Sequence, residues 1–184
     1  MKPLFTVHAG EYLVGSHIEE KFKNLNVWIP SKDTGIDLLV TDSENKYSAS
    51  LQVKFSKDFL VTHMEDTFQK GLVSCGWWTL NYDKIKASKA DYWVFVLHSF
   101  NTKIINYVII RPAELLCIYR DIHKEQKNIQ TYLWVTNSKK CWEARGLGKK
   151  DQILIANNAY KNSKRELTKY LNNWVPVLKA VKST

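Results

Sequence analysis

The sequence predicts an α/β domain with a mixed central sheet flanked by helices. Apolar residues recur at helical spacing near the N-terminus, at Val14, Ile18 and Phe22, which indicates an amphipathic helix. Two later stretches, Asp91–His98 (DYWVFVLH) and Ile104–Ile110 (IINYVII), are rich in β-branched and aromatic residues, as central strands are. The chain has 184 residues, 45% of them hydrophobic, and no repeat or linker, so residues 1–184 are expected to form one domain with a sizeable core.

In chain order, the first half predicts a helix over Gly10–Leu25 and then two strands within Thr34–Ser56. Those two strands are apolar runs joined by a polar connector (TGIDLLVTDSENKYSASLQVKFS), which is typical of a hairpin. Asp58–Val73 is expected to be partly helical, and Trp77–Leu80 to form a short strand.

The second half continues with the two central strands named above. Pro112–Ile122 predicts a helix, because proline is favoured in the first turn. Tyr132–Thr136 predicts a further strand. The last predicted helix covers Ser163–Val175, with an apolar stripe formed by Leu167, Tyr170, Leu171 and Trp174.

Composition and cysteine usage bound the cellular setting. No apolar run approaches the roughly 20 residues that span a bilayer, and the N-terminal residues MKPLFTVHAGEYLV lack the apolar centre of a signal peptide. Cys75, Cys117 and Cys141 are odd in number and far apart, which disfavours a disulfide framework or a structural zinc site. We therefore expect a cytoplasmic protein with reduced thiols and no membrane partner.

The positive charge is concentrated in the last quarter of the chain. The net charge is +9, and residues 139–184 carry eleven Lys and Arg against three acids, a net +8. Such a basic portion favours a polyanionic partner, nucleic acid first and an anionic membrane second, although a merely solvated basic surface also fits the charge alone. Five residues flank the segment RGLGKK, which predicts an exposed basic loop able to clamp phosphate: Lys139, Lys140, Arg145, Lys149 and Lys150.

Three polar residues interrupt the apolar runs of the predicted hairpin. Side chains alternate faces along a strand, so Gln52 and Lys54 share one face of the second run. Asp37 falls on the corresponding face of the first run, and a turn centred between Asn45 and Lys46 would place it opposite Lys54. Parity therefore gathers an acid, an amide and an amine on one face, while the other face is apolar.

A second acid falls on the apolar stripe of the first helix. At 100° per residue, Glu11 lies about 20° from both Ile18 and Phe22 on the helical wheel. A carboxylate on a buried stripe is costly unless it is paired, protonated or bound to a metal. We therefore add Glu11 to the candidate site.

The oxygen donors of these residues suit Mg²⁺ or Mn²⁺, which prefer carboxylate and carbonyl ligands. A lysine beside such a group can orient a water molecule or stabilise charge on a phosphate. The set therefore suits metal-assisted hydrolysis of phosphodiesters. The alternative is a hairpin with one polar face, in which Asp37 and Lys54 form an ordinary cross-strand ion pair.

The order of these motifs resembles the PD-(D/E)XK nuclease superfamily. GEYLVGSHIEEKF, TGIDLLV and LQVKFS lie in the first third of the chain, and ADYWVFVL and NYVIIRPAEL follow as a strand and as a strand leading into a helix. The resemblance implies a restriction-endonuclease-like fold and Mg²⁺-dependent cleavage of DNA in restriction, repair or recombination. It assigns Asp37 as the metal-binding acid, Gln52 and Lys54 as the (D/E)-x-K pair, and Glu11 as the accessory acid.

One position departs from that pattern. Gln52 stands where the family has an acid, so a carbonyl oxygen remains but one negative charge is lost, which weakens metal binding. The expected function is thus a Mg²⁺- or Mn²⁺-dependent DNA endonuclease, expected as a homodimer because a duplex has two strands to cut. A catalytically inactive DNA-binding or interaction module of the same fold, and an RNA nuclease, stay open as alternatives.

Overall fold

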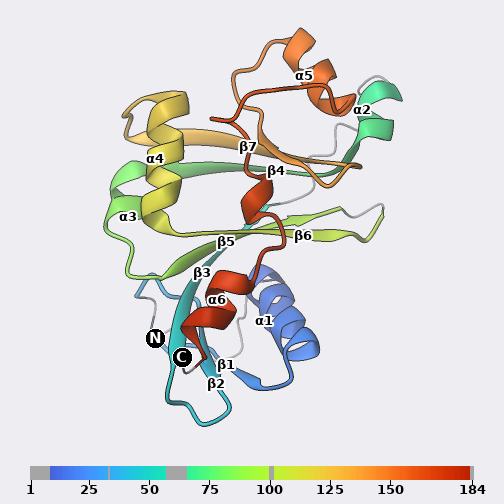
Figure 1. Cartoon of the computed structure of the whole chain (residues 1–184). Coiled ribbons are helices and arrows are strands. Elements are labelled where there is room, and N and C mark those ends of the chain that lie inside the picture. Colours follow the sequence, from blue (N-terminus) through green and yellow to red (C-terminus); the bar gives the residue numbers. More distant parts are fainter. Residues whose placement is uncertain (1–8, 33, 57–65, 100–101, 183–184) are drawn as a thin grey trace.

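The computed structural model describes residues 9–32, 34–56, 66–99 and 102–182. It is a mixed α/β structure with two sheets, as Figure 1 shows. The mixed central sheet that the sequence predicts is present and has five strands, in the order β1 (Leu25–Trp28), β2 (Leu38–Asp42), β3 (Ser48–Ser56), β5 (Tyr92–His98) and β6 (Ile105–Ile110). The pairing of β3 with β5 is parallel, and the other pairings are antiparallel.

A second sheet, which the sequence did not predict, packs on one face of the first. It is antiparallel, in the order β4 (Leu72–Asn81), β7 (Asn128–Thr136) and β8 (Cys141–Glu143). Trp93 and Phe95 of β5 share a buried core with Trp78 of β4 and Leu133 of β7. One face of the central sheet is therefore covered largely by another sheet, whereas helices pack on the other face.

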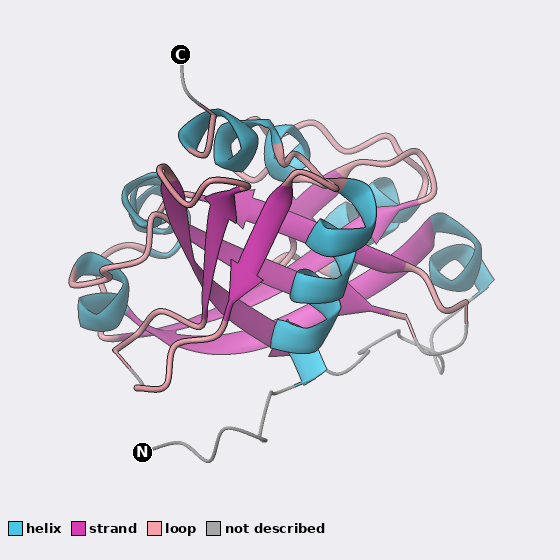
Figure 2. Cartoon of the chain, turned by 90° about the horizontal axis from the view of Figure 1, so that it is seen from below, coloured by secondary structure: helices cyan, strands magenta, loops and turns pink. Residues whose placement is uncertain are grey.

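That other face carries α1 (Ala9–Lys21) and α6 (Val175–Ala180). Val14 and Ile18 of α1 pack with Leu38, Leu51 and Val53 of β2 and β3 in a second core. In Figure 2, α1 lies in front of the strands of the first sheet. The predicted amphipathic helix is confirmed, but it ends at Lys21 because the chain enters β1 at Leu25.

The remaining helices surround the second sheet. They are α2 (Asp66–Gly71), α3 (Tyr82–Lys86), α4 (Pro112–His123) and α5 (Lys149–Ala156). On its outer face Trp134 and Trp142 form a third core with α2 and α5 (Figure 1). Among helices of the described residues, none is both long and apolar enough to cross a membrane.

The helix predicted over Ser163–Val175 is wrong. This segment contains a 3₁₀ turn at Thr168–Tyr170 and otherwise pairs with the sheets. Glu166 forms a bridge to Trp142 at the edge of the second sheet, and Leu171 forms a bridge to Val108 of β6. The backbone therefore bonds to two sheet edges and forms a single 3₁₀ turn in place of a continuous α-helix.

Candidate active site

The turn between β2 and β3 sets the register of the hairpin. The Asp42 carboxylate accepts the backbone N–H groups of Lys46 (2.7 Å) and Tyr47 (3.0 Å), and Asn45 adopts a left-handed conformation (φ 58°) that asparagine tolerates. Leu38 then faces Leu51, so the turn lies one residue earlier than the sequence predicts. When the turn moves by one residue, the residue opposite any given position on the partner strand changes by two.

The shift corrects the partner of Asp37 but preserves parity. Extended by one residue, the observed register places Asp37 beside Gln52, not opposite Lys54. The Asp37 N–H donates to the Leu51 carbonyl (2.8 Å), and the Val53 N–H donates to Asp37 Oδ2 (2.7 Å). Gly35, with φ 82°, turns the chain just before this point. The carboxylate is thus fixed against the β3 backbone between Gln52 and Lys54.

Gln52 and Lys54 lie on the face of β3 that meets the second sheet. The Lys54 Nζ lies 4.9 Å from the centroid of the Trp93 ring, and Trp93 belongs to the core between the two sheets. The side chains of both Gln52 and Lys54 are half-buried. A cation–π contact thus holds the Lys54 ammonium group near the part of β3 to which Asp37 is bonded.

Glu11 lies in the first turn of α1, which packs on the same stretch of β3. The helix α1 packs against Val53 and Phe55, and a Cβ atom on Gly10 would lie only 2.6 Å from the Phe55 Cβ. Glu11 follows Gly10 on the buried side of α1 and is 7% exposed. Asp37, Gln52 and Lys54 therefore lie on or beside residues 51–55 of β3, and Glu11 follows the residue of α1 that packs on the same stretch.

The donors in this arrangement fit a hard divalent cation by their chemistry. Asp37 supplies a carboxylate fixed by one hydrogen bond, which leaves further lone pairs available, and Gln52 supplies an amide oxygen at the adjacent register position. Within the described part of the chain, no group of three or more His, Cys, Asp or Glu residues is placed to hold a metal ion. A cation here would therefore depend on the amide of Gln52.

The five basic residues predicted to flank one exposed loop occupy three places. Lys139 and Lys140 lie in the β7–β8 turn, whereas Lys149 and Lys150 form the first turn of α5. Residues 145–148 form a loop, as predicted, but the loop ends at Gly148, the N-cap of α5. Leu147 packs on the third core, and its carbonyl accepts a hydrogen bond from Gln152 Nε2 (2.9 Å).

The fifth basic residue, Arg145, donates a hydrogen bond to Gln130 of β7. Two lysines in the first turn of α5 oppose the positive end of the helix dipole. Asp151 in the same turn offsets part of this unfavourable charge.

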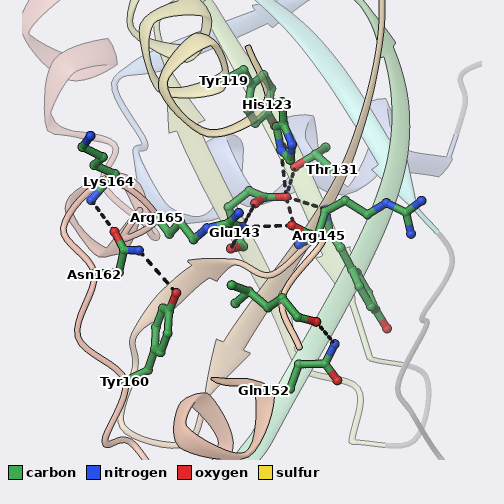
Figure 3. Close-up of polar contacts among 12 residues, drawn as sticks. Tyr119, His123, Thr131, Glu143, Arg145, Gln152, Tyr160, Asn162, Lys164 and Arg165 are labelled. Carbon is green, nitrogen blue, oxygen red and sulfur yellow. Dashed lines mark hydrogen bonds and ion pairs between the residues drawn. The ribbon is translucent and has the colours of Figure 1, made fainter. Parts of the chain in front are cut away.

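A buried carboxylate, which the sequence analysis did not single out, organises this basic region (Figure 3). Glu143 is fully buried, and its Oε2 lies 2.7 Å from Arg165 Nη1. Its Oε1 accepts the Arg145 N–H (3.1 Å) and lies 3.3 Å from His123 Nε2, which is not aligned for a hydrogen bond. The only signal in the sequence is an acid inside the apolar run Cys141–Ala144.

Comparisons of the chain with protein-family models, curated proteins and solved structures find no match.

Proposed function

We propose that this protein is a Mg²⁺- or Mn²⁺-dependent DNA endonuclease with a restriction-endonuclease-like fold. The observation that carries the proposal is the position of Asp37, whose carboxylate is bonded to the backbone between Gln52 and Lys54. The order of elements supports it further, because α1 precedes a three-stranded antiparallel meander and β5 then adds in parallel to β3.

In this proposal Asp37 and Gln52 would hold the cation, and Glu11 would contribute directly or through water. The bound cation supplies Lewis-acid stabilisation of the charge on the scissile phosphate. Lys54, held over Trp93, positions the attacking water or stabilises the phosphate charge. Asp37 depends on the Val53 N–H for its orientation, so β3 contributes its backbone as well as its side chains.

The test is cleavage of supercoiled plasmid with Mg²⁺ or Mn²⁺ by the wild type, Asp37→Asn and Lys54→Met. Both variants keep roughly the same side-chain volume, so the fold should be retained. Circular dichroism checks this expectation. We expect both to lose at least about 100-fold in rate, the usual effect of removing one group that acts on the transition state. Equal cleavage by all three proteins would refute the assignment.

A catalytically inactive DNA-binding module is the second candidate. It is favoured by Gln52, which supplies one charge fewer than a carboxylate would at that position. Under this alternative the wild type binds duplex DNA but cuts neither DNA nor RNA with either metal. Parallel assays on duplex DNA, single-stranded DNA and RNA separate this outcome from an RNA nuclease.

A further inference from the structure

A groove of about 680 Å³ opens on the second sheet, away from Asp37. Its walls come from β8 and from the segment that follows α5. Three lysines and one acid line it: Lys140, Lys161, Lys164 and Glu166. Trp142 and Tyr160 form its aromatic wall. Of these residues, only Lys140 was among the predicted phosphate-binding residues.

The groove is built on a rigid scaffold. The Glu143 N–H donates to the Arg165 carbonyl (2.9 Å), and the Leu167 N–H donates to the Cys141 carbonyl (2.8 Å). The side chain of Asn162 accepts the Lys164 N–H (3.1 Å), and its amide donates to the Tyr160 hydroxyl (3.4 Å), as Figure 3 shows. The backbone carrying Lys161 and Lys164 is therefore fixed against β8.

The positive charges that reach solvent in this groove are lysine charges. Arg165 lies beside it but is paired with the buried Glu143, and Arg145 is bonded to Gln130. These are the two arginines of residues 139–184, so both have internal partners. Lysine is a point charge without the planar fork that arginine uses to read guanine or to grip one phosphate bidentately. The groove is therefore suited to phosphates along a backbone.

The aromatic wall does not offer a stacking surface. Trp142 is 2% exposed and Tyr160 is 8% exposed, so neither ring can receive a nucleobase. Small-molecule sites are mostly apolar, whereas the accessible chemistry here is a set of ammonium groups. Lys139 precedes the groove residue Lys140, and residues 139–184 carry a net charge of +8, which favours a long polyanion over a small ligand.

We propose that this groove binds the sugar-phosphate backbone of nucleic acid without sequence preference, at a site separate from Asp37. The binding requires no metal and no cleavage, so it stands or falls independently of the proposed nuclease function. Lys140, Lys161 and Lys164 each contact a phosphate, and Glu166 limits the net charge of the groove.

The experiment measures binding of a fluorescein-labelled DNA duplex by anisotropy in EDTA, over about 50–200 mM salt. The wild type is compared with the triple variant Lys140→Gln/Lys161→Gln/Lys164→Gln. The matched control is Lys84→Gln/Lys86→Gln/Lys89→Gln, which removes the same charge from exposed lysines at and after α3. We expect the groove variant to reduce the slope of log affinity against log salt by about 2–3, and the control by less than about 1.

An equal change in both variants, or none in the groove variant, would overturn the proposal. The proposal would also be overturned if the groove lysines were needed for binding to phosphatidylserine vesicles but not for binding to the duplex. Thermal unfolding of both triple variants checks that the fold is intact. Binding is measured in EDTA, where metal-dependent cleavage cannot occur, so failure of cleavage and failure of groove binding are read separately.

Discussion

The close approach of Gly10 to β3 predicts that a larger side chain at this position destabilises the packing of α1. A methyl group at residue 10 would meet the Phe55 Cβ at 2.6 Å and Val53 Cγ1 at 3.2 Å. Such overpacking costs about 1–3 kcal/mol, because the Cβ of Phe55 cannot rotate away. Replacing a helical glycine by alanine returns at most about 0.5–1 kcal/mol. We therefore expect Gly10→Ala to lower the free energy of unfolding by roughly 0.5–2 kcal/mol.

Gly15 supplies the control within the same helix. Its added methyl would lie 3.7 Å from Val27 Cγ1, an ordinary contact, so Gly15→Ala is expected to stabilise the protein by about 0.5–1 kcal/mol. Urea unfolding of both variants measures the difference, and thermal unfolding should separate them by several degrees, at about 2–4 °C per kcal/mol for a chain of this size. If Gly10→Ala is as stable as Gly15→Ala, α1 does not lie this close to β3.

Three further perturbations test other parts of the molecule. Gln52→Glu adds a carboxylate beside Asp37, so the Mg²⁺ concentration for half-maximal cleavage should fall about tenfold; an unchanged or higher value contradicts the assigned ligand role. Glu143→Gln leaves the Arg165 guanidinium without its buried charge partner and should destabilise the fold by about 3 kcal/mol in urea unfolding, whereas an effect below about 0.5 kcal/mol would show that the pair is dispensable. Burial, and secondly the charge of Lys21, lower the pKa of His17 in the folded protein, so the unfolded chain binds the proton first and stability falls as pH drops below about 6.5. His17→Phe, which can keep the stack on Trp174, should lose less stability than the wild type between pH 7 and pH 5, and parallel losses would contradict this reasoning.

The period-two pattern of the hairpin predicted the faces of Gln52 and Lys54 but not the register. Parity depends only on the strand residues, and a register error of two leaves it unchanged. Register depends on the turn, where the side chain of Asp42 bonds to Lys46 and Tyr47. Such a local competition between side chain and backbone is not visible in hydrophobic periodicity.

The failed C-terminal helix shows a different limit. Its apolar stripe did predict burial, because Leu167 is 0% exposed and Trp174 is 6% exposed. The two residues, however, enter different cores, Leu167 between the sheets and Trp174 against α1. Apolar spacing records which side chains are buried, but a segment that crosses between two cores can reproduce helical spacing without forming a helix.

The two short strands β1 and β8 were missed for a related reason. Three or four residues are too few to show a period, and their pairing depends on neighbours supplied by the fold. Lys161 and Lys164 could have been noticed from the basic run KNSKRE, but their proximity to Lys140 depends on the bridge between Trp142 and Glu166.

The segment from Glu166 to Asn172 connects the outer edges of both sheets. The Asn172 N–H donates to the Tyr107 carbonyl (2.6 Å) and the Asn172 side chain accepts the Tyr107 N–H (2.8 Å), while Leu167 is bonded to Cys141. The amide protons of Leu167 and Asn172 should therefore exchange with solvent in one cooperative opening, although they belong to different sheets. A pulling force applied at the C-terminus would break the bonds of this segment to the central sheet first and its bonds to the groove strand β8 second. The order of mechanical unfolding therefore reports how the two sheets are joined.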